Sequence, residues 1–422
     1  LKCSSLELLL TLATNHSFFI AIIMYSSFDA FKPHFNALAR VGYFKMVFKS
    51  SSKIKQTLNV YYRVVIWFFV ILYNMQHVLR VIQVWHSIDE IVNTLFILLT
   101  TLNTLGKQIA FNVRSVRIDR LIDKINGSLF TPGSNYQDKV MRHHAKSMLR
   151  LLRMYHCAIF LCGLMWTIFP VVDRALGEDV QFTGYFPFDT SKTPVFELTV
   201  TYMSILITLQ AYGNVTMDCT IVAFYAQAKT QLQMLRYDLE NLSNTDGENN
   251  KDIHKIILKT YKDVESIRFR RLLQRKFVKC MQHHQQILWF VKEVQSIFAE
   301  AMVVQFFVMA WVICMTVYKI VGLSILSAEF FSMAMYLGCM LAQLFIYCYY
   351  GTQLKYESDC VNQSIYDCEW TSLSPAARRH LLILMVRCSR PLAPTIAHIV
   401  PMSMDTYISV RITFTINDCY SL

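Results

Sequence analysis

Adjacent histidines and scattered cysteines are the residues of this chain whose types could bind a metal or support catalysis. The histidines form two adjacent pairs, His143–His144 and His283–His284. Neighbouring residues on a helix point about 100° apart, so neither pair can direct both rings at one ion. The 12 cysteines include no Cys-x-x-Cys pair, and no glycine-rich phosphate loop, Ser-His-Asp set or nucleophile elbow is present. The sequence therefore predicts no enzyme, no cofactor and no metal site.

One acidic residue stands out because it lies inside an apolar run. Asp218 is the only charged residue of the stretch GNVTMDCTIVAFYAQ. An ionisable group in such a run faces a partner or a water-filled interior. We expect Asp218 to form a structural hydrogen bond to a neighbouring helix.

Aromatic and methionine side chains gather at one end of several apolar runs. Such side chains form adaptable apolar walls around small hydrophobic ligands, although they also serve ordinary helix packing. Both interpretations stay open at this point. The candidate ligand-binding residues are Trp166, Phe169, Tyr202, Met203, Leu206, Phe330, Met333 and Tyr336.

The elements that must position these residues are membrane-spanning helices. Of 422 residues, 54% are hydrophobic and only 17% are charged, far from the composition of a soluble domain. A helix crosses the hydrocarbon core in about 20 residues. This length predicts an all-α, polytopic fold with seven spans, near residues 60–82, 88–111, 151–172, 196–225, 287–318, 325–350 and 395–417.

The positive charges predict how the spans are oriented. Alternate connecting segments carry 32 Lys and Arg residues on one side and four on the other. Since cytoplasmic loops are the basic ones, the N-terminus is expected inside and the C-terminus outside. The net charge of +12 is thus explained by a membrane face rather than by nucleic acid. A G-protein-coupled receptor has the opposite orientation, and its Asp-Arg-Tyr and Asn-Pro-x-x-Tyr motifs are absent.

The long basic segment before the fifth span, residues 226–286, repeats apolar residues at helical spacing over 255–282. A calmodulin-type target and a helix lying on anionic lipid are two interpretations of this pattern. We favour the third, a cytoplasmic extension of the neighbouring spans that packs as a helical bundle.

Several runs resemble the insect odorant receptors, and together they cover about residues 28–415. They are FDAFKPHF (28–35), which is typical of moth and butterfly members, HHQQILWFVKEVQSIF (283–298), QLFIYCYYGTQL (343–354), MVRCSRPL (385–392) and PMSMDTY (401–407). The sister family of gustatory receptors usually ends in Thr-Tyr-x-x-x-x-x-Gln-Phe. This chain has Thr406-Tyr407 but no Gln near Phe414, which favours the odorant receptors.

The resemblance implies a subunit of an odorant-gated, nonselective cation channel. A tuning subunit of this kind forms a heterotetramer with a common co-receptor subunit, and this chain lacks the longer cytoplasmic insertion of the co-receptor. The odorant, a small volatile molecule, would sit among helices two, three, four and six. A G-protein-coupled chemoreceptor and a gustatory-type channel are the alternatives. The expected location is the plasma membrane of olfactory neuron dendrites.

The predicted spans divide the chain into segments, and the resemblance implies the anchor and pore roles of the last two. Residues 1–59 form a cytoplasmic N-terminal segment, of which 1–27 are interpreted as extraneous. Spans one to four occupy 60–225, the cytoplasmic loop and helix extensions 226–286, and spans five and six 287–350. Residues 351–394 anchor the subunits to one another, with Tyr366, Trp370, Arg378, Arg379 and Pro391 as candidates. Residues 395–422 form the pore-lining seventh helix, with Thr413, Ile416 and Asn417 in the pore.

Overall fold

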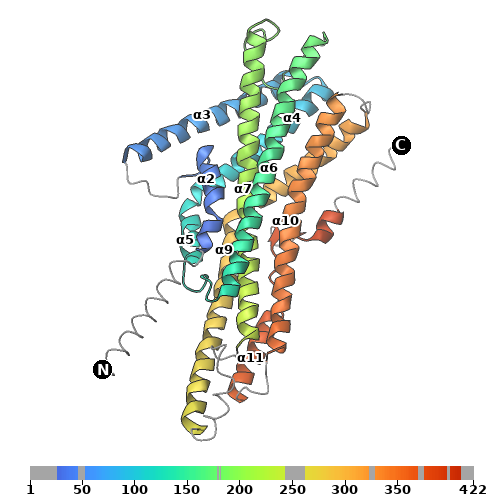
Figure 1. Ribbon diagram of the computed structural model, residues 1–422. Helices are drawn as coiled ribbons and strands as arrows, with labels where there is room; N and C mark the ends of the chain where they lie inside the picture. The colour runs from blue at the N-terminus through green and yellow to red at the C-terminus, as the bar shows by residue number, and fades with distance from the viewer. Residues whose placement is uncertain are drawn as a thin grey trace.

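The computed structural model describes residues 26–45, 53–177, 180, 182–242, 262–322, 328–368, 375–396 and 400–409. These residues form a bundle of long helices, of which α6, α7, α9 and α10 run lengthwise beside one another (Figure 1). The elements are η1 (Ser27–Ala30), α2 (Lys32–Arg40), α3 (Lys53–Gln83), α4 (Ile88–Val113), α5 (Ser115–Ile125), α6 (Asn135–Ala175), α7 (Val195–Glu240), α9 (Lys262–Val321), α10 (Ala328–Tyr366), α11 (Pro375–Cys388), β1 (Thr395–Ile396) and β2 (Val400–Pro401).

The long helices match six of the seven predicted spans. In the described part of the chain, α3, α6, α7, α9 and α10 are long and apolar enough to cross a membrane. The 26-residue α4 coincides with the second predicted span. Helices α6, α7 and α9 also continue well beyond the predicted spans, and α9 is unbroken over 60 residues. From residue 262 onward, the basic segment before the fifth span is thus continuous with α9.

The predicted seventh span begins too early. Thr395 pairs with Pro401 and Ile396 with Val400 in a two-residue antiparallel ladder, and a helical turn follows only at residues 404–409. Proline lacks the amide hydrogen that a helix interior needs, and Pro394 and Pro401 bracket this stretch. The predicted pore residues, at 413 and beyond, lie outside the described residues.

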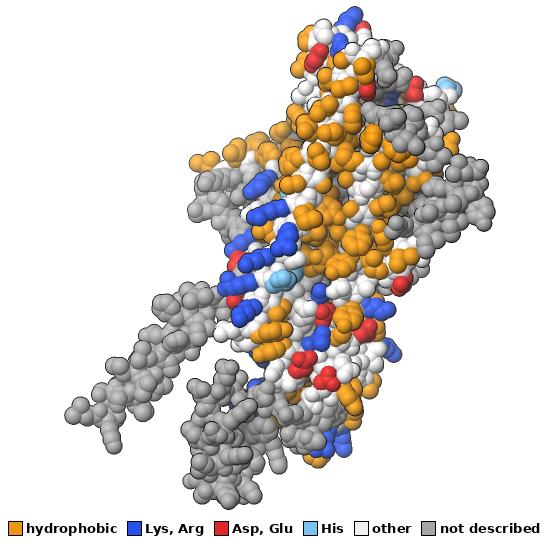
Figure 2. Space-filling model, turned by 45° about the vertical axis from the view of Figure 1, so that its right-hand side comes forward, with side chains coloured by type: hydrophobic (Ala, Val, Ile, Leu, Met, Phe, Trp, Pro, Cys, Tyr) orange, Lys and Arg blue, Asp and Glu red, His pale blue; other side chains and the backbone are white. Residues whose placement is uncertain are grey.

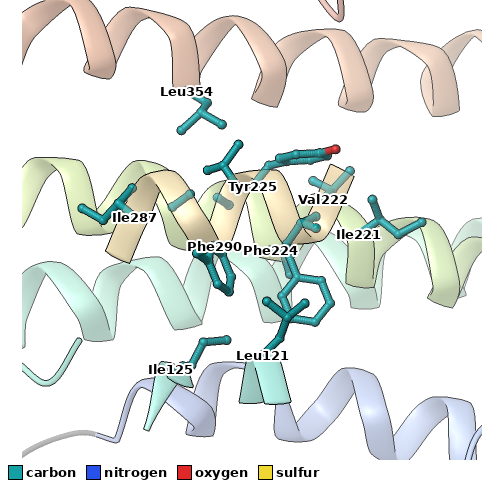
Figure 3. Close-up of a cluster of buried hydrophobic side chains, with 14 of the residues drawn as sticks. Leu121, Ile125, Ile221, Val222, Phe224, Tyr225, Ile287, Phe290 and Leu354 are labelled. Carbon is teal, nitrogen blue, oxygen red and sulfur yellow. The ribbon is translucent and has the colours of Figure 1, made fainter. Parts of the chain in front are cut away.

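Helix α7 forms the centre of the bundle. Nearly every side chain between Gly213 and Leu235 is buried, which is the pattern of a helix surrounded on all sides. Figure 3 shows Phe224 of this helix beside Phe290 of α9 and Leu121 of α5. From the N-terminal segment, Phe31 stacks on Phe224 with 4.9 Å between ring centroids. The described residues 26–45 therefore contribute to the core.

Two glycines allow unusually close approaches of neighbouring segments. A Cβ atom at Gly213 of α7 would overlap the ring of Tyr43, which is fully buried. A Cβ atom at Gly351 of α10 would overlap the carbonyl oxygen of Met402, directly after β2. Small residues at such positions let helices and segments pack closely inside a membrane protein.

The outer surface of the bundle is strongly apolar. Figure 2 shows a broad hydrophobic band that gives way at its lower edge to Lys, Arg, Asp and Glu side chains. Helix α3, which projects from the bundle in Figure 1, exposes a long row of apolar side chains, including Val64 at 61% and Phe68 at 61%. Apolar surface of this extent is explained by contact with lipid.

Candidate ligand-binding site

A cavity of about 630 Å³ lies inside the bundle, between α4, α6, α7 and α10. These helices are the second, third, fourth and sixth predicted spans, the same four that the resemblance indicated. The cavity is lined mainly by apolar side chains, with a few threonine and amide groups between them. The lining residues central to the site are Phe96, Thr100, Tyr155, Ile159, Cys162, Gly163, Trp166, Ile207, Gln210, Ala211, Asn214, Tyr336, Gly338 and Gln343.

Small residues on three of the helices leave the space for this cavity. Ala158 and Gly163 lie on α6, Ala211 on α7 and Gly338 on α10. Gly163 also sets the helix spacing, because a Cβ atom there would overlap the hydroxyl of Thr208 on α7. Larger side chains at these positions would fill the space between the four helices. The small ones leave a pocket of a size typical for small-molecule ligands.

The cavity contains a small number of polar groups. The Tyr336 hydroxyl and the Thr100 Oγ1 are 2.9 Å apart, so these two groups satisfy one another. Gln210 is 2% exposed, and neither its amide nitrogen nor its amide oxygen has a hydrogen-bond partner in the described part of the chain. The Asn214 Oδ1 is also without one there. Buried polar groups without partners are costly, so a ligand that pairs with Gln210 gains affinity.

A charged network forms the inner end of the cavity. Lys107 and Asp218 are each 1% exposed, and their Nζ and Oδ1 atoms are 2.5 Å apart. The Tyr347 hydroxyl donates to the same carboxylate at 2.6 Å, and the Gln343 amide donates to its second oxygen. Lys107, Asp218 and Tyr347 each lie about one helical turn past the last cavity-lining residue of their own helix. Asp218 therefore hydrogen-bonds to neighbouring helices, as predicted.

The cavity reaches the surface of the bundle beside α6. Met154 lines the cavity and is 62% exposed. The exposed side chains that follow on the same helix include Phe160, Leu161 and Leu164, all of them apolar. The opening thus lies on the apolar flank of the molecule.

The structure brings two of the eight predicted ligand-binding residues into this cavity, Trp166 and Tyr336. Four others, Tyr202, Met203, Leu206 and Met333, belong to the apolar cluster that Trp166 and Tyr336 also join. The Tyr202 hydroxyl donates to Gln76 at 2.9 Å. Phe169 is half-buried outside the lining, and Phe330 packs edge to face against Phe331. The centre of the cavity lies about two turns farther from the outer ends of the helices than the predicted residues, whose role in ligand binding stays a prediction.

Sequence reasoning missed the polar lining because it selected aromatic and methionine side chains. A usable signal was present in the spacing. Gln210 and Asn214 lie four residues apart in an apolar helix, and Thr100 and Thr104 do the same on α4. Polar residues repeated at helical spacing within a span mark the face that turns away from lipid.

The predicted anchor residues lie apart from this cavity. Tyr366 is at the end of α10, Arg378 and Arg379 are on α11, and Pro391 follows α11. All four are exposed. Trp370 lies outside the described residues.

Comparison with known proteins shows to which protein family the chain belongs. A family model described as 7tm Odorant receptor matches residues 87–413, which is more than half of the chain. The chain belongs to the 7tm odorant receptor family. This finding confirms the resemblance inferred from the sequence and the all-α, seven-helix membrane fold class. It also identifies the chain as a receptor rather than an enzyme.

Individual odorant receptors show how distant the similarity is. The chain is 26% identical to Odorant receptor Or1 of Anopheles gambiae over 65% of this chain and 66% of that one. It is 24% identical to Odorant receptor 46a, isoform A, of Drosophila melanogaster over 78% of this chain and 81% of that one. The solved olfactory receptor OR5 from Machilis hrabei shares the fold with a TM-score of 0.76 at 15% identity, covering 93% of this chain and 97% of that chain. A second OR5 structure, in complex with eugenol, gives a TM-score of 0.73 at 16% identity, covering 91% and 95%.

Proposed function

We propose that this odorant receptor is the tuning subunit of an odorant-gated, nonselective cation channel. It assembles as a heterotetramer with a common co-receptor subunit in the plasma membrane of olfactory neuron dendrites. The observation that carries the proposal is the cavity of about 630 Å³ between α4, α6, α7 and α10, in a chain of this family. The odorant is a small, mainly apolar volatile molecule that occupies this cavity.

The distribution of the remaining segments supports the channel assignment. The last part of the chain, from residue 402 on, supplies the pore helix, with Thr413 and Asn417 as polar lining and Ile416 as the apolar constriction. Polar groups in a span are tolerated where they line water, and the Asp and Asn residues of this segment fit that role. Arg378 and Arg379 are exposed on α11, where we place the contacts with neighbouring subunits.

Whole-cell currents test the proposal. The chain is expressed with and without the co-receptor subunit, an odorant panel is applied, and G-protein signalling is blocked. We expect a fast, nonselective cation current that requires the co-receptor and survives the block. A response that disappears with the block would contradict the channel assignment. A current that persists unchanged without the co-receptor would contradict the assignment as a tuning subunit.

The unpartnered amide of Gln210 predicts the chemistry of the preferred ligand. In Gln210→Leu, the cavity keeps about the same volume but loses its free hydrogen-bonding group. We expect responses to alcohols, aldehydes or esters to weaken about tenfold relative to hydrocarbons of the same size, which corresponds to one hydrogen bond of about 1–1.5 kcal/mol. Dose–response curves for oxygenated and hydrocarbon ligands measure the change.

Phe169→Leu is the matched control for this experiment, because Phe169 is on α6 but outside the cavity lining. Its dose–response curves are expected to follow those of the unchanged receptor. If Gln210→Leu leaves the preference for oxygenated ligands intact, the ligand does not bind at this amide.

A further inference from the structure

A second cavity lies at the opposite end of the helices from the apolar cluster that contains Trp166 and Tyr336. It has a volume of about 750 Å³ and is formed by the first turns of α6, the last turns of α7 and the middle of α10. Unlike the ligand cavity, it is lined by basic side chains, namely Lys139, His143, Lys229 and Arg236. This end of the bundle carries the Lys- and Arg-rich connections that the charge bias assigns to the cytoplasm.

Two of these cations lack acidic partners. The Lys229 Nζ atom is half-buried and donates to the neutral amide oxygen of Gln353 at 3.0 Å. In the described part of the chain, no carboxylate lies within the 4.0 Å ion-pair distance of Lys229 or Lys139, although 11 ion pairs occur there, two of them at Arg236 of this cavity. A half-buried cation without a counter-ion is an attractive position for an anionic ligand.

The cavity also contains an unsatisfied imidazole. His144 is 8% exposed and lines the cavity, and its Nε2 atom has no hydrogen-bond partner among the described residues. Arg236 is held differently, because its guanidinium contacts Glu357 at 2.8 Å and Ser364 at 3.0 Å. Glu240, the acid of this cavity, accepts from Ser364 at 2.7 Å and lies 4.0 Å from Arg236. The groups that can donate hydrogen bonds to a ligand are therefore those on α6, together with Lys229 of α7.

The position of the cavity along the helices matches the level of lipid headgroups. Met148 and Ala226 line its end nearer the apolar spans, and Tyr349 and Tyr350 of α10 border it. Tyrosine is enriched at membrane–water interfaces, where its ring meets the acyl boundary and its hydroxyl meets water. Tyr136 and Tyr237, stacked with 4.5 Å between ring centroids, border the far end.

We infer that this cavity binds the multiply phosphorylated headgroup of an anionic lipid of the inner leaflet, a phosphoinositide. Lys139, Lys229 and the two histidines face the phosphates, and the tyrosines mark the depth at which the headgroup enters. Acyl chains attached to such a headgroup continue along the apolar flank of α6. This site is separate from the odorant cavity, and it does not depend on the proposed channel activity.

The surface of α6 beside the cavity favours a lipid source over a soluble phosphate. Lys146, Arg150 and Arg153 are exposed and lie at helical spacing on α6, next to the apolar span. Basic side chains close to an anionic leaflet each contribute about 1 kcal/mol of attraction. A lipid is thus guided to the cavity along the membrane surface, whereas a free phosphate has no such attachment.

Thermal unfolding of the full chain in lipid nanodiscs tests this inference. Discs of phosphatidylcholine alone are compared with discs that also contain phosphatidylinositol bisphosphate, or phosphatidylserine at equal total charge. We expect the bisphosphate lipid to raise the unfolding temperature by several degrees, and phosphatidylserine to raise it less, because specific binding to the folded state stabilises it. Equal shifts with both lipids would overturn the inference, since they indicate general electrostatic attraction.

Variants separate the cavity from the rest of the basic surface. Lys139→Gln/Lys229→Gln is expected to remove the extra shift caused by the bisphosphate lipid. Lys124→Gln/Lys292→Gln, which removes the same charge from exposed lysines of α5 and α9, is expected to keep it. Lys139→Gln alone alters an exposed side chain and serves if the double variant does not fold. Loss of the shift in the control pair, or its retention in both Lys139 variants, would overturn the assignment.

One further arm distinguishes the source of the phosphate. Inositol trisphosphate, added to phosphatidylcholine discs, presents the headgroup without its acyl chains. We expect a smaller stabilisation than the lipid gives. If the soluble headgroup stabilises the chain as strongly as the lipid, the cavity binds a free polyphosphate and the lipid assignment is wrong.

Discussion

Asp218→Ala is expected to prevent most of the chain from reaching the cell surface in a folded state. The substitution leaves Lys107 as a fully buried charge in the middle of the bundle, together with the unpaired hydroxyl of Tyr347. Removing one member of a buried ion pair typically costs about 3–5 kcal/mol, a large part of the stability of a protein. Surface labelling and thermal unfolding in detergent measure the loss.

The double variant Lys107→Met/Asp218→Leu decides whether the uncompensated charge is the cause. It removes both charges and keeps apolar volume, so we expect it to recover much of the surface amount lost in Asp218→Ala. Asp189→Ala, in the exposed pair of Lys192 and Asp189, is expected to have no measurable effect. A double variant as unstable as Asp218→Ala would show that packing, and not charge, dominates at this position.

Gly351→Ala is expected to abolish most of the odorant-evoked current. The new Cβ atom would overlap the carbonyl oxygen of Met402, so the segment after β2 must move away from α10. This segment leads directly into the proposed pore helix. Helix propensity alone predicts the opposite, because alanine is about 1 kcal/mol more favourable than glycine inside a helix. Current measured at equal surface amount tests the expectation.

Gly106→Ala is the matched control, because Gly106 is inside α4 and a Cβ atom there meets nothing within 4 Å. We expect this variant to be neutral or slightly more stable, with normal currents. If Gly351→Ala behaves in the same way, the close approach of Met402 to α10 is not required for gating.

The sequence predicted the six clear spans well because each is an apolar run long enough to cross a bilayer on its own. It predicted their extensions less well, since the first two turns of α6 are polar and are ordered by packing against α7. Hydropathy identifies the segments that prefer lipid to water. It does not predict how far a helix continues past the membrane into water. The ladder of Thr395–Ile396 with Val400–Pro401 was missed although Pro394 and Pro401 gave a clear signal against a helix.

The location of the site was predictable in part. The choice of four helices came from the family resemblance, and the cavity lies between them. The position of the cavity along the helices depends on where Gly163 and Ala211 leave space. The pattern of large side chains in the sequence does not indicate such a space. The partner of Asp218 could not be named either, because Lys107 is more than 100 residues away in the chain. Such pairing is set by how the helices assemble.

The opening beside Met154 has a consequence for the proposed odorant, because it would set the phase from which the ligand enters. An odorant that enters through an apolar flank arrives from the bilayer, where hydrophobic volatiles accumulate. Each added CH₂ group favours transfer out of water by about 0.8 kcal/mol, or roughly fourfold in concentration. For a ligand of this kind, we therefore expect the apparent sensitivity of the receptor to a homologous series to rise with chain length, because longer members are more concentrated in the membrane. The limit is reached when the molecule outgrows the about 630 Å³ available to it.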